Sequence, residues 1–237
     1  MRSTEGVETD AKSIETMNLH FAQLLDSALP VGAFSHSFGL ETFLSNGEIS
    51  NIARLHEFCV AALHGNWAPC DAMLIKAAFT LETREVWRLD CLMDAARVSR
   101  ETREGQRKIG RQGLKLGAQI LPDARWQPLQ IAAKNGDCAP SWPLVFGWWA
   151  RLCGQNQSGA ATGYLFACCN AALGAGVRWG ICGQTQAQRA LGALAGECEA
   201  AWAGVENQNP FDFWSATPLL ERAQIEHENL EARLFMS

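Results

Sequence analysis

Apolar residues recur along most of this chain at intervals of three and four, which is the spacing of one helical face. The clearest run follows Ser50, the expected N-cap, and comprises Leu55, Phe58, Cys59, Ala62 and Leu63. No segment shows the sustained alternation that is typical of a strand, and Val and Ile are scarce. The pattern therefore predicts an all-α fold.

Pro, Gly and capping residues divide this pattern into about ten helices. We expect one compact multi-helix domain over residues 17–237 and a flexible tail over residues 1–16, which are polar and mixed in charge. The expected helices are 17–27, 39–45, one after Ser50, 68–81, 83–98, 99–120, 143–153, 158–174 with a further run to 180, 184–205, and one from Thr217-Pro218 toward Arg233. A kink is expected at residues 174–176, where Gly-Ala-Gly weakens the helix.

One stretch, residues 152–177, carries no charge and is long enough to span a bilayer. It contains several Gln and Asn side chains and is rich in Ala and Gly rather than in Leu or Ile. This composition favours the buried central helix of a helical domain, in which small residues let neighbouring helices approach closely. A membrane-associated helical protein remains the alternative, and we expect no membrane partner.

The helix expected over residues 99–120 carries a basic stripe. Its cations are spaced by three, four, four and four, so they share one face: Arg100, Arg103, Arg107, Arg111 and Lys115. Such a stripe is either a solvated face or a docking surface for an acidic partner.

Composition and cysteine spacing bear on the possible ligands and on the location of the protein. The chain has 237 residues and a formal net charge of −5, which gives no reason to expect nucleic-acid binding. Its nine Cys are irregularly spaced without a Cys-x-x-Cys pair, and residues 1–16 have no apolar signal region. We therefore expect buried thiols, a cytoplasmic location, no metal site and no cofactor. His56 and Cys59, three apart on a helix, are interpreted as core packing.

The loop over residues 28–41 gathers a Pro, two Gly, two aromatic rings and a His. A tight turn between helices is one interpretation. A second is a small hydrolase that uses His36 with Ser35 or Ser37, oriented by Glu41 one helical turn away. No Gly-x-Ser-x-Gly elbow and no phosphate-binding Gly-rich loop occurs in the chain.

The last residues are unusual because three apolar residues, 234–236, end an otherwise polar segment. An exposed chain end usually frays unless something covers it. Two roles stay open from the residues alone: an anchor for a partner surface, or docking back onto the chain's own core.

Four motifs in this order resemble the urease accessory protein UreF family. Residues 29–41 are similar to its signature Ala-Leu-Pro-Val-Gly-aromatic-Ser-x-Ser-x-Gly-Leu-Glu, and residues 100–103 with Gly110 to its central Arg-x-x-x-Glu-x-Arg helix. Residues 183–188 are similar to its Gly-Gln-x-x-x-Gln segment. Residues 227–237 are similar to its ending His-Glu-x-x-x-x-Arg-Leu-Phe/Tyr-x-Ser. The resemblance extends from about residue 24 to residue 237.

The resemblance implies a non-catalytic all-α homodimer that binds UreD (also called UreH) and the GTPase UreG and helps to deliver nickel to apo-urease. Phe34, with Ser35 and His36 beside it, stands in the loop that contributes to recruiting the GTPase. Arg178 occupies the position of a basic residue just ahead of the Gly-Gln segment. Gln184 is the Gln of that segment, which is suggested to influence GTP hydrolysis by the partner. The segment that becomes ordered against UreD contains His227, Glu228, Arg233, Leu234 and Phe235. The first loop is shaped by Leu29, Pro30 and Gly32.

Overall fold

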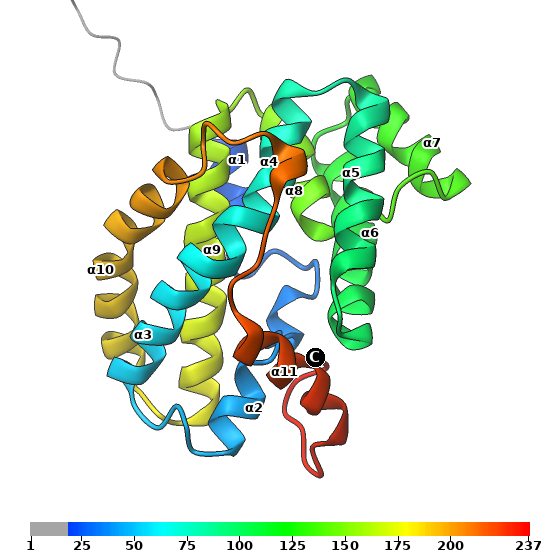
Figure 1. The fold of residues 1–237 in the computed structure, drawn as a ribbon. Coiled ribbons are helices and arrows are strands. Elements are labelled where there is room, and N and C mark those ends of the chain that lie inside the picture. Colours follow the sequence, from blue (N-terminus) through cyan, green and yellow to red (C-terminus); the bar gives the residue numbers. More distant parts are fainter. Residues whose placement is uncertain (1–18) are drawn as a thin grey trace, which may run out of the picture.

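The computed structural model describes residues 19–237, and all regular structure within that range is helical (Figure 1). The all-α prediction is confirmed, whereas the tail expected over residues 1–16 lies outside the described residues. The α-helices are α1 (Leu19–Leu25), α2 (Leu40–Ser45), α3 (Ile52–Ala62), α4 (Ala72–Thr80), α5 (Thr83–Ala96), α6 (Arg100–Ile120), α7 (Gln127–Asn135), α8 (Trp142–Leu152), α9 (Gln157–Trp179), α10 (Gln184–Ala203) and α11 (Pro218–Glu226). Short 3-10 turns cover Ala33–Ser35, Ala124–Trp126, Pro210–Asp212 and His227–Asn229.

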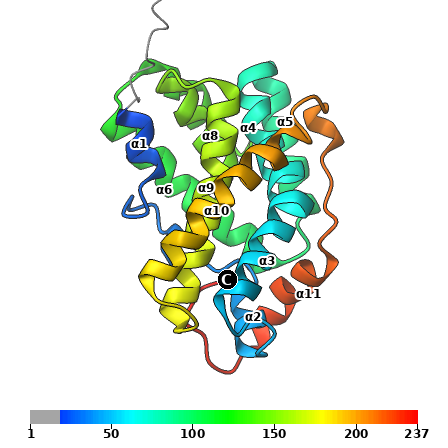
Figure 2. The same ribbon diagram turned by 90° about the vertical axis from the view of Figure 1, so that its left-hand side faces the viewer.

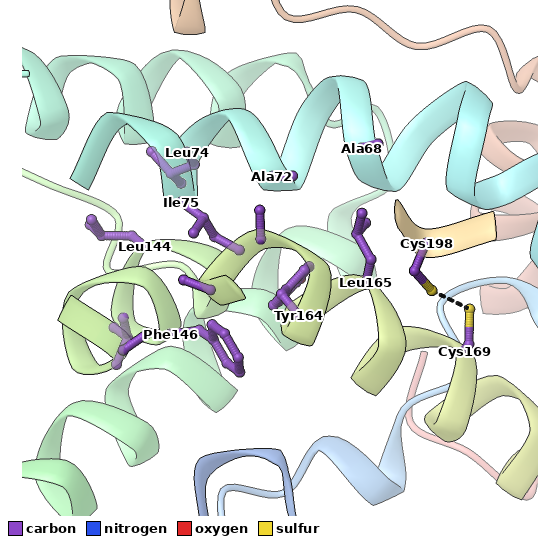
Figure 3. Packing of buried hydrophobic residues seen from close by; sticks show 14 of the residues in the cluster. Ala68, Ala72, Leu74, Ile75, Leu144, Phe146, Tyr164, Leu165, Cys169 and Cys198 are labelled. Atoms are coloured by element: carbon purple, nitrogen blue, oxygen red, sulfur yellow. Dashed lines mark hydrogen bonds between the residues drawn. The ribbon is translucent and has the colours of Figure 1, made fainter. Parts of the chain in front are cut away.

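The helices pack around α8 and α9. Helix α10 lies along α9, while α4 and α6 flank α8, and α3 covers α9 and α10 (Figures 1 and 2). Small residues allow neighbouring helices to approach closely. A Cβ added at Gly147 of α8 would lie 3.0 Å from the Cα atom of Ile75 on α4. Figure 3 shows Ala68 and Ala72 facing Tyr164 and Leu165 of α9 across the core.

Helix α9 runs through residues 174–176 as one continuous helix, so the chain does not leave the helical conformation where a kink was expected. Gly176 allows a close approach of α3, because an added Cβ would lie 2.4 Å from the Cδ2 atom of Leu55, which would then have to shift. By length and composition α9 could cross a membrane, but half of its most apolar window is buried inside the protein. Its buried side chains contact α4, α8 and α10, as expected of a core helix.

Helices α3 and α4 are joined by a π-helical stretch, Leu63–Asp71, rather than separated as the sequence suggested. Pro69 lies inside it. Proline lacks an N–H and its ring disrupts a regular α-helix, so a locally widened helix accommodates it. The N-cap of α3 is Asn51 rather than the expected Ser50, because the Asn51 side chain accepts a hydrogen bond from the Arg54 N–H at 3.1 Å.

The nine Cys are all free thiols. Most are buried, as expected, but Cys91 is exposed and Cys70 and Cys168 are half-buried. Cys169 and Cys198 join α9 to α10, with their sulfur atoms 4.0 Å apart (Figure 3). Contact with Cys59 and burial raise the pKa of Cys169, and contact with Cys169 and burial raise that of Cys198, so both thiols behave as small apolar residues.

The last helix is shorter than expected. Helix α11 ends at Glu226 and does not continue toward Arg233, and Thr217 contributes no side-chain cap. A 3-10 turn, His227–Asn229, follows, and the chain then extends back toward the loop before α2. The reason is non-local, because His227 is fully buried between side chains of α2 and α6.

Candidate functional site

The loop between α1 and α2 holds an unusual backbone conformation. Gly32 has φ 88° and begins the 3-10 turn Ala33–Ser35, which carries Phe34. Before it, the Leu29 N–H donates to the Asp26 carbonyl at 3.0 Å, and the Val31 N–H donates to the Leu29 carbonyl at 2.7 Å and closes a turn around Pro30. The expectation that these residues shape the loop therefore has a clear physical basis, since only Gly adopts positive φ without strain.

Arg178 connects this loop to the end of the chain. Its guanidinium carbon lies 3.6 Å from the centre of the Phe34 ring and 4.7 Å from that of Phe235. Its Nη2 atom also donates to the Phe34 carbonyl at 3.0 Å, across 144 residues of sequence. Arg178 occupies the last turn of α9, where a cation also opposes the helix dipole. Burial lowers its pKa. Three predicted site residues thus meet in one cation–π cluster.

Residues 230–237, which we call the C-terminal strap, lie against the loop. The Met236 N–H donates to the Ser35 carbonyl at 2.8 Å, and the Phe38 N–H donates to the Ser237 main-chain oxygen at 2.9 Å. Side chains alternate along the strap: Phe235 and Ser237 are buried, whereas Leu234 and Met236 are more than half exposed. Of the two roles left open for this segment, the described chain adopts docking onto its own core.

A buried charged cluster fixes the start of the strap. Glu41 of α2 is fully buried and accepts hydrogen bonds from His227 Nε2 at 2.7 Å, the Leu234 N–H at 2.5 Å and the Phe235 N–H at 3.1 Å. Glu101 of α6 contacts His227 Nδ1 and Arg233 Nη1, each at 2.7 Å. Each ring nitrogen of His227 therefore faces one carboxyl group.

In the cluster two carboxyl groups, those of Glu41 and Glu101, share the His227 ring, and Glu101 also binds the Arg233 guanidinium. Burial alone would raise the pKa of Glu101, but the hydrogen bonds from His227 and Arg233 outweigh it and lower that pKa. A buried charge is tolerated when it is paired and hydrogen-bonded, as every member is here. Sequence reasoning missed the central role of Glu41. Its signal was a lone carboxylate in the short apolar helix α2.

The arrangement needed for a hydrolase is absent from the loop. Glu41 binds His227 and not His36, so the expected orientation of His36 by Glu41 is wrong. The His36 ring stacks on Phe38 with ring centres 5.4 Å apart, and its Nδ1 lies 2.7 Å from Ser237 Oγ. Burial lowers the pKa of His36 to about 4, so the ring is neutral at physiological pH and holds the strap rather than a nucleophile.

Two predicted site residues, Glu228 and Gln184, belong neither to the cation–π cluster nor to the buried charged cluster. Glu228 points outward and pairs with Arg100 at 3.1 Å. Gln184 is the exposed first residue of α10. With Phe34, His36 and Arg178, it lines a largely apolar cavity of about 680 Å³. Within residues 19–237 no three His, Cys, Asp or Glu side chains are arranged to hold a metal ion.

The turn before Gln184 has a defined geometry. Gly180 has φ 91°, its N–H bonds to the Val177 carbonyl, and the Ile181 N–H bonds to the Gly176 carbonyl at 3.1 Å. These bonds form the glycine-ended Schellman motif that closes many helices. The Gln186 side chain then accepts from the Gly183 N–H at 2.9 Å and starts α10, which places Gln184 outward.

Comparison with known proteins decides the family. The family model UreF matches residues 49–195. Over 94% of its length the chain is 32% identical to the urease accessory protein UreF of Paenarthrobacter aurescens (strain TC1), covering 99% of that protein. The chain belongs to the UreF family. It is also similar to the UreF proteins of Arthrobacter sp. (strain FB24), at 32% identity over 92% of this chain and 96% of that protein, and of Actinobacillus pleuropneumoniae, at 33% over 90% and 96%.

Membership of the UreF family accounts for the resemblance of the loop, the Gly-Gln segment and the C-terminal residues. A UreF protein is an accessory protein, which is consistent with the dispersed Ser35, His36 and Glu41 contacts. The UreF model match includes Arg178 and Gln184, whereas the loop and the strap lie outside it.

Proposed function

We propose that this UreF-family chain scaffolds a complex with UreD and the GTPase UreG and regulates that GTPase during nickel insertion into apo-urease. One observation carries the proposal: the Arg178 guanidinium contacts the rings of both Phe34 and Phe235. One side chain thereby joins the loop expected to recruit UreG to the segment expected to bind UreD. We propose that the chain acts as a homodimer in the cytoplasm and is not itself an enzyme.

The geometry supports coupling between the two partner sites. Phe34 is 62% exposed, yet its carbonyl and ring are both held by Arg178, which also contacts the strap residue Phe235. A partner that orders or displaces the strap changes the contacts of Arg178 and hence the presentation of Phe34. Such a difference in contacts is what allows one partner to alter the affinity of another.

Regulation of the GTPase is assigned to the surface around Gln184. Its side chain is exposed at the start of α10, beside the cavity that Phe34 and Arg178 also line. An accessory protein controls a GTPase either by holding one conformation of it or by supplying a positioned side chain, as activating proteins do. We propose Gln184 as the residue that contacts UreG for this purpose.

Co-expression with UreD and UreG tests the proposal. Phe34→Asp places a charge on an exposed side chain, so we expect the fold and UreD binding to persist while UreG no longer co-purifies. Ile131→Asp is the matched control, because Ile131 of α7 is 58% exposed and far along the chain from the loop. Removal of residues 227–237 is expected to abolish UreD binding, with circular dichroism as the check on folding. Retention of UreG by Phe34→Asp, or of UreD by the truncated chain, would contradict the assignment.

A further inference from the structure

The basic stripe of α6 is divided by the structure into two parts. Arg103 donates to the carbonyls of Arg97 and Val98, and Arg107 forms a bidentate pair with Asp94. Both side chains are half-buried, so this part of the stripe serves the chain's own fold. Arg100 pairs with Glu104 and Glu228. The expectation of a solvated face therefore does not hold for Arg103 and Arg107.

The remaining cations of the stripe, together with the neighbouring Lys108, form an exposed group on α6. Lys108, Arg111 and Lys115 are spaced by three and four residues, so their side chains share one face, and all three are exposed. No carboxylate among the described residues forms an ion pair with any of them. Like charges at this spacing repel one another, so a carboxylate-bearing partner would relieve the repulsion.

This face is continuous with the C-terminal strap. Lys108 Nζ lies 3.6 Å from Met236 Sδ, and Gln112 Nε2 donates to the Pro30 carbonyl at 3.4 Å. Leu234 and Met236 project outward from the strap and are 57% and 53% exposed. Met236 thus borders Lys108 at one end of this row of cations, and the exposed Leu234 lies two residues before it in the strap. We call Lys108, Arg111, Lys115, Leu234 and Met236 the basic–apolar face.

We infer that the basic–apolar face docks an acidic protein surface, with carboxylates opposite Arg111 and Lys115 and an apolar recess for Leu234 and Met236. The inference rests on the proposed function and identifies the chemistry of the UreD surface that receives the strap. A protein fits better than a nucleic acid because apolar side chains border the cations and the chain carries a net charge of −5.

A double charge reversal tests this inference. Arg111→Glu with Lys115→Glu changes two exposed side chains without internal partners, so the fold is retained. The control is Arg84→Glu with Lys134→Glu, which makes the same change in net charge at exposed positions of α5 and α7. Binding of each purified variant to purified UreD is measured by surface plasmon resonance at 50 and 500 mM NaCl.

We expect the Arg111/Lys115 reversal to raise the Kd for UreD at least tenfold at 50 mM NaCl, mainly through slower association, and the control to stay within about twofold. The dependence of Kd on salt should also become weaker in the reversal than in the wild type. Equal Kd values and equal salt dependence for both variants would overturn the inference. Failure of the wild-type chain to bind UreD would instead refute the proposed function.

Other occupants of the face give distinct results. If the reversal leaves UreD affinity unchanged but abolishes dimerisation in analytical ultracentrifugation, the face binds a second copy of the chain and the inference is wrong. If it changes only the binding of poly-uridylate RNA, the occupant is a nucleic acid.

Discussion

Glu41→Gln should release the C-terminal strap while leaving the helical core folded. The Glu41 carboxylate is fully buried and accepts three hydrogen bonds, from the His227 ring and from the N–H groups of Leu234 and Phe235. A glutamine has nearly the same shape, but one carboxylate oxygen becomes an NH₂ group that faces donors. The variant therefore removes charge and acceptor capacity with little change in volume.

The size of the effect follows from these contacts. A hydrogen bond to a charged group contributes about 1.5–3 kcal/mol, and breaking one partner of a buried ion pair costs about 3–5 kcal/mol. Because the amide retains one acceptor, we expect a loss of about 3 kcal/mol in strap docking, which is roughly a hundredfold in its opening equilibrium. Glu228→Gln is the matched control. It removes an exposed pair with Arg100, whose loss costs no more than about 1 kcal/mol.

Trypsin cleavage after Arg233 reports strap opening, since the Leu234 N–H in that peptide bond is held by Glu41. When opening and closing are fast compared with cleavage, the cleavage rate follows the population of the open form. Release of residues 234–237, measured by mass spectrometry, should accelerate about a hundredfold in Glu41→Gln and less than about fivefold in Glu228→Gln. Equal rates in the two variants would refute the assignment of Glu41 as the anchor of the strap.

Two further predictions concern the stability of the fold. Gly110→Ala should lower the free energy of unfolding in urea by more than about 3 kcal/mol, because its Cβ would lie 1.9 Å from the Pro140 carbonyl oxygen, whereas Gly192→Ala, with no atom within 4 Å, should raise it by up to about 1 kcal/mol. Since burial lowers the pKa of His36 from 6.5 to about 4, its contribution is complete above pH 6.5 and is lost toward pH 4. Urea unfolding should therefore show about 2 kcal/mol less stability at pH 5 than at pH 6.5 from this group. His36→Gln should show a smaller loss between those two pH values, and an unchanged loss would contradict the assignment.

The candidate site was predicted residue by residue but not as an arrangement. Phe34, Arg178 and Phe235 were each named from motifs, yet nothing in their local sequence indicated that Arg178 contacts both rings. Glu41 was paired with the wrong histidine, because sequence proximity suggested His36, whereas the tertiary fold brings His227 to it from 186 residues away.

The spacing of apolar residues by itself determined that the described chain is all-helical, and its Pro, Gly and capping residues located most helices. This succeeds because amphipathic periodicity is a local property that the chain carries whatever its surroundings. Only the tertiary structure decided where contacts between distant segments override the local helix signals. Gly176 of α9 packs closely against Leu55 of α3, and α11 stops at Glu226 because the carboxyl groups of Glu41 and Glu101 hold the following His227. Contacts between distant segments outweigh the small local preferences that a sequence pattern records.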